Sequence, residues 1–328
     1  WNTDNLPAPA TEDPSAYFQT TLYEGDGSTQ SIDQDGNSTF SPNLVWIKNR
    51  DATDSHALFD TVRGATEVLS SNSTGAEATN ADTLTAFESD GFALGDDVIV
   101  NTNAESYVAW QWDEGATPGF DIVSYSGTGA NRTVAHNLGV KPGMFIIKQR
   151  GASGSNWGVY HSAVGATKSL FLQSRGAATD SAEYFNDTEP TASVFTLGVN
   201  AQGNADGGTY IAYVFAPVEG FSKFGSYVGN GSTNGPMVNL GFQPAFLIFK
   251  TTGDNKWIMK DSKRDPFNPS SLSLVPSENV AELTSDQLLD INSNGFKLRT
   301  TGSATNSDGV TYVYMAFAES PFKTANAQ

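Results

Sequence analysis

Residues that could do chemistry recur along this chain at steps of about 100 positions. Aligning Gly64-Ala65-Thr66 with Gly165-Ala166-Thr167 places Asp60 opposite His161, and Asp261 falls one further step along. The aligned residues differ between copies, and the sequence has neither a Gly-x-Ser-x-Gly elbow nor a His-x-x-x-His metal pair. No Ser/His/Asp triad is indicated, so we predict that the protein is not an enzyme. Its many carboxylates leave a glycosidase pair as an alternative.

Two tryptophans that align with His56 are better candidates for an exposed binding face than the repeated tyrosines are. Trp157 and Trp257 have polar neighbours in the sequence, and an exposed indole can stack on a sugar ring. Burial in a core is the alternative. The tyrosines that open the last apolar run of each copy alternate with alanine and valine, which favours core packing for Tyr107, Tyr210 and Tyr312.

Each copy also ends an apolar run with a lysine. Pro42–Lys48, Pro142–Lys148 and Pro244–Lys250 share this pattern, and successive lysines lie 100 and 102 positions apart. Lysines at equivalent places could contact a ligand or form salt bridges between domains. We favour a structural interpretation, in which the strand ends in solvent and the aliphatic stem of the lysine covers apolar surface.

Acidic turns make calcium the one cofactor to consider. Asp206, Asp308 and the pair Asp96-Asp97 lie in loops rich in the oxygen ligands that calcium prefers. The sequence has neither an EF-hand loop nor a repeated calcium nonapeptide, and Asp206-Gly207 and Asp308-Gly309 are typical of hairpin turns. We therefore predict solvated turns and no cofactor, with calcium as the alternative.

An internal repeat organises these residues. A Tyr-x-Gly-x-Gly motif begins at Tyr23, Tyr125 and Tyr227, in two steps of 102 residues, and three further anchors follow in the same order in each copy. Such self-similarity predicts three tandem domains of about 100 residues. We place them at residues 17–117, 118–218 and 219–322, with a linker or arm at residues 1–16 and a tail at residues 323–328.

Strand signals outweigh helical ones within each copy. Aromatic and β-branched residues come in short runs that Gly, Asp and Asn bound, as strands do. Many short strands with turns between them predict an all-β chain of three tandem β-sandwich domains, jelly-roll-like in type. Short helices are expected only over Ser285–Ile291 and around Asp60–Ser70.

Composition excludes several classes of protein. The chain has 328 residues, 36 Asp and Glu against 18 Lys and Arg, and a net charge of −18. Such a surface repels phosphate backbones, so nucleic acid is not expected as a partner. The chain has no cysteine, which excludes disulfides and thiolate metal sites. Its longest apolar runs, such as Tyr210–Pro217, are far shorter than the roughly 20 residues that cross a bilayer.

The first domain resembles a domain of tailed-phage virion proteins. The residues that carry the resemblance are Ser41–Arg50, Asp51–Asp60 with His56 and Phe59, Arg63-Gly64-Ala65, Leu69–Asn72 and Phe87–Phe92. The match is looser over the other two domains, and domain two lacks the Ser-Asp-Gly-Phe turn. That family is frequent in marine and cyanobacterial phages, and its members resemble tail-fibre or appendage proteins. It supplies no catalytic residues.

This resemblance implies a non-enzymatic component of a fibre, a spike or a capsid decoration. Such a protein is assembled in the host cytoplasm and exposed on the surface of the virion. The expected partners are other virion proteins, a glycan of the host surface and further copies of the chain. Three rigid domains could gain avidity by presenting one surface repeatedly, or could pack around a pseudo-threefold axis. A purely architectural virion subunit and a polysaccharide depolymerase stay open as alternatives.

Overall fold

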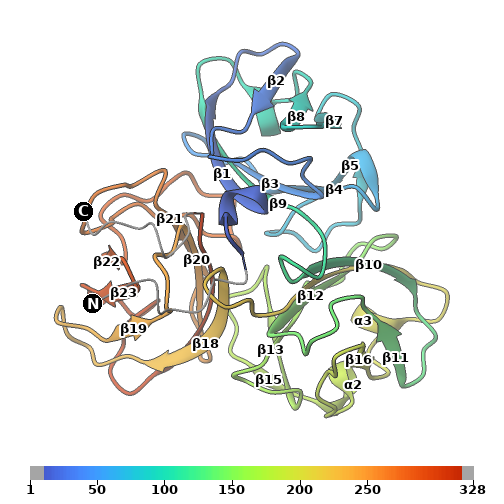
Figure 1. The fold of residues 1–328 in the computed structure, drawn as a ribbon. Coiled ribbons are helices and arrows are strands. Elements are labelled where there is room, and N and C mark those ends of the chain that lie inside the picture. The colour runs from blue at the N-terminus through green and yellow to red at the C-terminus, as the bar shows by residue number, and fades with distance from the viewer. Residues whose placement is uncertain (1–10, 320–328) are drawn as a thin grey trace.

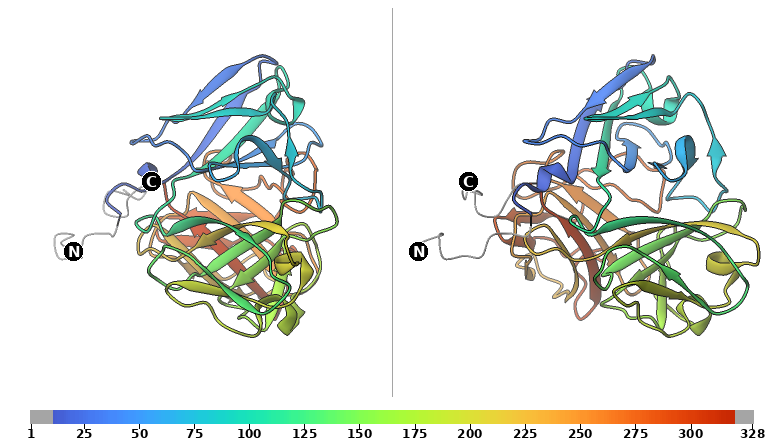
Figure 2. Two further views of the ribbon diagram at one scale, coloured as in Figure 1. Left: turned by 90° about the vertical axis from the view of Figure 1, so that its right-hand side faces the viewer. Right: turned by 45° about the vertical axis from the view of Figure 1, so that its right-hand side comes forward.

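Strands form nearly all the regular structure of residues 11–319, the part of the chain that the computed structural model describes. The prediction of an all-β, sandwich-type fold is confirmed. Figure 1 shows three lobes around a common centre, and Figure 2 shows them from two further sides. We call these lobes repeats 1, 2 and 3 in chain order.

Part of the expected N-terminal linker is packed onto repeat 1. Pro14–Ala16 form a short 3-10 helix, which Asp13 caps by accepting a hydrogen bond from Ser15 N at 3.0 Å. The buried Ser15 hydroxyl accepts a hydrogen bond from Ser38 N at 3.0 Å. Residues 1–10 of the expected linker and the tail at residues 323–328 lie outside the described residues.

Each repeat has one large antiparallel sheet in which the last strand of the repeat pairs with the first strand. In repeat 1 the order is β1 (Phe18–Glu24), β9 (Ser106–Trp112), β3 (Leu44–Asn49), β4 (Ala57–Asp60), β5 (Gly64–Leu69) and β6 (Ala78–Thr79). In repeat 2 it is β10 (Phe120–Ser126), β17 (Thr209–Phe215), β12 (Met144–Gln149), β13 (Gly158–His161), β14 (Lys168–Phe171) and β15 (Thr179–Asp180). In repeat 3 it is β18 (Ser222–Val228), β24 (Thr311–Phe317), β20 (Phe246–Thr251) and β21 (Ile258–Asp261).

A small sheet covers the outer face of each large sheet. These small sheets are β2 (Gln30–Asp33), β8 (Gly91–Leu94) and β7 (Leu84–Glu88) in repeat 1, β11 (Arg132–Ala135) and β16 (Val194–Leu197) in repeat 2, and β19 (Met237–Asn239), β23 (Gly295–Leu298) and β22 (Leu289–Asn292) in repeat 3. Single-turn helices join some strands: α1 (Val98–Asn101), α2 (Ala182–Phe185) and α3 (Ala201–Asn204). The expected domain boundaries at 117/118 and 218/219 fall between β9 and β10 and between β17 and β18.

The central strands of the large sheets are buried on both faces. Alternate residues of a strand point to opposite faces, and in β3 Trp46 faces the centre of the molecule while Val45 and Ile47 pack under the small sheet. Repeats 2 and 3 each have a corresponding core between their large and small sheets. A strand buried on both faces gives a continuous apolar run, which is why these strands are so apolar.

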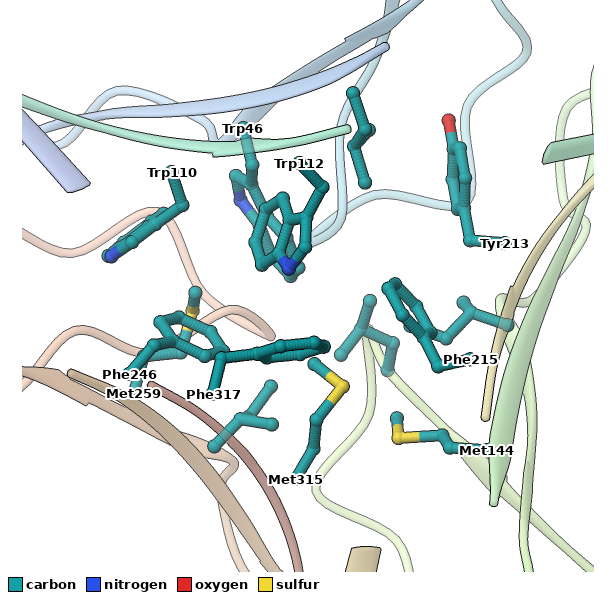
Figure 3. Close-up of a cluster of buried hydrophobic side chains, with 14 of the residues drawn as sticks. Trp46, Trp110, Trp112, Met144, Tyr213, Phe215, Phe246, Met259, Met315 and Phe317 are labelled. Carbon is teal, nitrogen blue, oxygen red and sulfur yellow. The ribbon is translucent and has the colours of Figure 1, made fainter. Parts of the chain in front are cut away.

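One further core joins the three repeats at the centre. Trp112, Phe215 and Phe317, which end the last strand of each repeat, form a triangle of rings. The centroid of the Trp112 ring lies 6.4 Å from that of Phe215 and 5.9 Å from that of Phe317, and the latter two lie 5.9 Å apart (Figure 3). The repeats therefore share a hydrophobic core and pack around a pseudo-threefold axis.

Three local expectations are wrong. Ser285–Ile291 is not helical, because Leu289 begins β22 and Ser285 has a positive φ of 57°. The stretch around Asp60–Ser70 contains the last residue of β4 and the whole of β5 and is not helical. Asp206-Gly207 and Asp308-Gly309 do not close two-residue hairpins, because β17 and β24 pair with the first and third strands of their repeats. Within residues 11–319 no helix is long and apolar enough to span a membrane.

Candidate functional site

The three repeated lysines are buried. Lys48, Lys148 and Lys250 are each 0% exposed, so the expectation that they meet solvent at a strand end is wrong. Each ammonium donates hydrogen bonds to backbone carbonyls at the end of its strand or in the loop that follows. The acceptors are Asn49 and Ala52 for Lys48, Ser155 for Lys148, and Thr251 and Gly253 for Lys250, at 2.5 to 3.1 Å. Burial lowers the pKa of each ammonium to about 8. A buried charge is tolerated only where acceptors surround it. Through these hydrogen bonds each lysine holds the backbone that follows its strand in place.

Trp157 and Trp257 are buried as well, with 0% and 1% of their surface exposed. The expectation that they are exposed ligand contacts is wrong. Each indole lies at a boundary between repeats and donates a hydrogen bond across it. Trp157 Nε1 lies 3.0 Å from Ser70 O of repeat 1, and Trp257 Nε1 lies 2.9 Å from Phe171 O of repeat 2. Their polar sequence neighbours belong to the loops, whereas the rings face the next repeat.

His56 occupies the corresponding place at the boundary between repeats 3 and 1. Its Nδ1 accepts a hydrogen bond from Trp46 Nε1 at 3.0 Å, which assigns the proton to Nε2. Nε2 then donates to Val275 O of repeat 3 at 3.1 Å. Burial, together with the nearby Lys48 charge, holds the pKa of His56 well below its usual value. The imidazole is therefore a neutral link between repeats.

A second set of aligned side chains completes a ring of contacts. The contacts are Tyr213 Oη to Asp60 Oδ2 at 2.7 Å, His161 Nε2 to Tyr314 O at 3.0 Å, and Trp110 Nε1 to Asp261 Oδ2 at 3.2 Å. They join repeat 1 to 2, repeat 2 to 3 and repeat 3 to 1. The residues that align with one another thus form equivalent contacts, although their chemistry differs.

Charged side chains extend this contact at the boundary between repeats 1 and 2. Arg63 forms an ion pair with Asp60, and both side chains are fully buried. Arg63 also lies 3.1 Å from Glu77, which in turn lies 2.7 Å from Arg150 of repeat 2. The result is a chain of alternating charges from Asp60 to Arg150, in which each carboxylate has a guanidinium partner.

The boundary between repeats 3 and 1 has the same chain of charges. Arg264 lies 2.5 Å from Asp261 and 2.6 Å from Glu282, and Arg50 of repeat 1 lies 2.8 Å from Glu282. Burial would raise the pKa of Glu282, but hydrogen bonds and charges from Arg50 and Arg264 hold it below its usual value. Glu282 is therefore ionised and fastens the two repeats.

The boundary between repeats 2 and 3 has no such charges at these positions. His161, Val164, Ala178 and Thr252 stand where repeats 1 and 3 have acidic or basic residues. The backbone contact is nevertheless the same: Ala178 N donates to Thr252 O at 2.9 Å, as Glu77 N does to Arg150 O at 2.9 Å. Burial lowers the pKa of His161 to about 4, so this position is neutral. The ion pair that crosses this boundary stands elsewhere, between Arg175 of repeat 2 and Glu278 of repeat 3 at 2.6 Å.

The acidic turns are exposed except at Asp97, which binds the start of a helix. Asp97 caps α1 by accepting from Ile99 N at 2.8 Å, and Asp206 and Asp308 are exposed. Nearby, a buried asparagine in each repeat bonds the Tyr-x-Gly-x-Gly loop: Asn101, Asn204 and Asn306 accept from Asp26 N, Thr128 N and Asn230 N at 2.9 Å each. Within residues 11–319, no group of three or more acidic or histidine side chains is placed to hold a metal.

A polar recess opens at the boundary between repeats 1 and 2. Its volume is about 320 Å³, and it is lined by Glu67, Ala76, Glu77, Thr79, Arg150, Gly151 and Thr209. A recess of this size is at the lower end of the range for small-ligand sites. It contains none of the five residues that the sequence suggested as ligand contacts.

Sequence reasoning missed the arginines and glutamates of the two chains of alternating charges. A signal for the arginines was present, since Asp60-x-x-Arg63 recurs as Asp261-x-x-Arg264 at aligned positions. Glu77 and Glu282 had no such signal, because they lie in loops of different length. Gly151 and Thr209, which line the recess, were equally inconspicuous.

Comparison with family models gives a match over most of the chain. The model of a family described as "Domain of unknown function (DUF7483)" matches residues 13–321. No curated protein matches the chain. A solved structure described as "Crystal Structure of the STIV MCP" is 9% identical over 95% of this chain and 99% of its own, with a TM-score of 0.19. A similarity this low carries no argument about fold or function.

Proposed function

Since the chain belongs to the family described as a domain of unknown function (DUF7483), its role must be inferred from its own residues, and we propose a non-enzymatic structural module of a tailed-phage particle. The module acts as a rigid body of three repeats that places surface loops at fixed positions. It is assembled in the host cytoplasm and exposed on the virion.

One observation carries the structural part of this proposal. The residues with the best chemistry for a reaction hold the three repeats together, as His56, His161, Asp60 and Asp261 each bond across a boundary. Groups engaged in this way position the scaffold and have no free face for a substrate. The phage origin is supported by the resemblance of residues 41–92 to virion domains.

Attachment to a host glycan is the second candidate function. The polar recess between repeats 1 and 2 favours it, because its carboxylate, guanidinium and hydroxyl groups are of the kind that bond sugar hydroxyls. A purely architectural subunit would use the surface for other virion proteins and leave the recess empty.

The structural role is tested on particles of the phage that encodes the chain. Mass spectrometry of purified particles should find its peptides in fixed proportion to the major virion proteins, and an antibody should label intact particles. Peptides present in the lysate but absent from washed particles would overturn the proposal.

Attachment and catalysis are tested with the purified chain. We expect saturable binding to intact host cells and to extracted surface glycans, unchanged by EDTA. The same glycans should show no release of reducing ends after incubation. Loss of binding in EDTA would indicate a metal, and release of reducing ends would revive the depolymerase alternative.

A further inference from the structure

The recess between repeats 1 and 2 can be compared with the same place at another boundary of the molecule. Repeats 1 and 2 have the same backbone there: Arg50 N donates to Ser106 O at 2.8 Å, and Arg150 N donates to Thr209 O at 2.8 Å. Ser106 and Thr209 each begin the last strand of their repeat, after the same kind of turn. The two places therefore differ mainly in their side chains.

Asp51 supplies the side chain that the recess lacks. At the boundary between repeats 3 and 1, a carboxylate oxygen of Asp51 accepts a hydrogen bond from Ser106 N at 2.6 Å. Gly151 stands at the aligned position in repeat 2 and has no side chain to accept from Thr209 N. Because the N–H and C=O of one strand residue point to the same edge, Thr209 N–H faces Gly151 and the recess.

The remaining groups of the recess define the chemistry of an occupant. The Glu67 carboxylate accepts hydrogen bonds from the Thr79 hydroxyl at 3.0 and 3.1 Å, and it has capacity for further donors. Glu77 is already paired with Arg63 and Arg150. The recess thus offers one backbone donor, hydroxyl groups and a carboxylate acceptor.

Charge argues against an anion in this place. Glu67 has no cation partner among the ion pairs of residues 11–319, and the charge of Arg150 is balanced by Glu77. A bound anion would face the Glu67 carboxylate at short range, and like charges disfavour one another. A neutral ligand rich in hydroxyl groups can both accept from the amide and donate to the carboxylate.

We propose that this recess binds one neutral sugar residue of a glycan through its hydroxyl groups. One hydroxyl oxygen accepts from Thr209 N–H, at the place that the Asp51 carboxylate takes in repeat 1. A neighbouring hydroxyl donates to Glu67. The proposal rests on the proposed attachment function and names the site and the ligand class for it.

Affinity at a single recess of this kind is weak. It has no aromatic platform among its lining residues, so hydrogen bonds that compete with water supply the contact. We expect a dissociation constant of about 1–10 mM for a monosaccharide, and attachment of a particle then depends on many copies.

Gly151→Asp is the variant that tests the site. It installs the carboxylate that repeat 1 already has, so that Thr209 N–H is occupied and the recess is partly filled. Gly151 has no positive φ, and a Cβ there meets only the Thr209 hydroxyl, at 3.3 Å, so this exposed side chain has to shift by a few tenths of an ångström. Gly253→Asp at the aligned position of repeat 3 is the matched control, with its nearest contact at 3.6 Å.

The measurement is a titration of the full chain with D-galactose, D-glucose and N-acetyl-D-glucosamine, followed by amide shifts in NMR. At least one sugar should shift the amides of Thr79, Arg150 and Thr209 in the unmodified chain and in Gly253→Asp. In Gly151→Asp the affinity should fall about tenfold or more. Equal titration of all three proteins, or no shift at these amides with about 100 mM of any sugar, would overturn the proposal.

Binding to host cells separates failure of this site from failure of the attachment function. If cells bind the unmodified chain and Gly151→Asp equally well, the recess is excluded as the attachment site and attachment occurs through another surface. Cells that bind neither protein, while a monosaccharide still titrates the recess, would support the site and remove host attachment.

Discussion

A buried carboxylate and its arginine partner are either both present or both absent at the corresponding positions of the three repeats. Repeats 1 and 3 bury a carboxylate, and an arginine three residues later pairs with it, as in Asp60 and Arg63. In repeat 2 the same two positions hold His161 and Val164, so the charge and its partner are both absent. A buried charge without its partner is costly, which explains why the two positions change together.

Breaking and restoring this pairing should give different stabilities. Arg63→Val alone leaves the Asp60 carboxylate buried without its cation, and we expect it to lower the free energy of unfolding by about 3–5 kcal/mol. Adding Asp60→His copies the pair of repeat 2 and should recover part of the loss. Urea denaturation of the two variants measures the difference; a double variant no more stable than Arg63→Val would contradict this explanation.

Trp112 differs from its counterparts by one unsatisfied group. Its Nε1 is buried without a hydrogen-bond partner among the described residues, and the corresponding residues are Phe215 and Phe317. Trp112→Phe removes this group but also some packing, so we expect a change in stability within about 1 kcal/mol. Trp112→Ala opens the shared core and should cost about 3–5 kcal/mol. Guanidinium denaturation measures the free energy of unfolding of both variants. Equal losses would show that the unpaired indole N–H does not destabilise the protein.

Corresponding elements also differ in how well they fill their cores. The strands β4, β13 and β21 begin with Ala57, Gly158 and Ile258. Gly158 has nothing within 4 Å of the place that a Cβ would take, and it lines a void of about 10 Å³ beside Tyr184 and Phe185. Repeat 2 therefore carries a small packing defect at the start of β13.

Filling this void should stabilise the protein. Gly158 lies in β13 without a positive φ, so Gly158→Ala introduces a methyl group without strain and also restricts the unfolded chain. We expect a gain of about 1 kcal/mol in the free energy of unfolding, seen as a raised Tm. Gly139→Ala is the control, because Gly139 also has open space but a φ of 70°, and it should destabilise. A lowered Tm for Gly158→Ala would mean that the void is not available to a methyl group.

The order and class of the elements could be predicted from the sequence, because the anchors mark turns and strand ends at a constant step. Trp157 and Trp257 were misplaced because their polar neighbours lie along the chain, whereas burial depends on which repeat packs above the ring. The lysines were misplaced for a different reason, because the carbonyls that accept from them follow within a few residues but fold back over the ammonium, which the residue pattern does not show. Contacts between elements distant in sequence leave no local pattern.

The boundaries around repeat 3 should weaken on mild acidification. His56 and His161 link it to repeats 1 and 2 as neutral rings whose pKa values burial depresses, for His161 to about 4. The unfolded chain binds protons below about pH 6.5 while the folded one does not, so stability is full above that pH and falls toward pH 4. His161 alone should account for about 3 kcal/mol.

Denaturation of the protein between pH 7 and pH 4 measures this loss. His161→Gln should reduce the slope of stability against pH. His136→Gln is the control, because His136 bonds Thr191 O within its own repeat. A slope that His161→Gln leaves unchanged would assign the pH dependence to other groups.

The whole molecule is a closed ring around one core. Each repeat bonds the next, and repeat 3 bonds repeat 1 through His56 and Arg50. The two ends of the described chain also meet, since Tyr17 packs on Phe221 at 6.3 Å between ring centroids and Ala318 N donates to Phe221 O at 2.8 Å. A ring closed in this way has no terminal repeat that can separate at low cost.

Unfolding should therefore be a single cooperative transition, although the chain has three repeats. Independent sandwiches would melt one by one. Here the unfolding of repeat 3, for example, exposes Trp112 and Phe215 of the shared core to water. Differential scanning calorimetry should give a calorimetric enthalpy close to the van 't Hoff enthalpy of the whole chain. A shortened chain of residues 11–218 should fail to fold. It keeps Trp112 and Phe215 of the triangle in Figure 3 but lacks repeat 3, whose Phe317 covers them. Two or more resolved transitions, or a stable shortened chain, would show that the repeats are autonomous and that the central core only joins them.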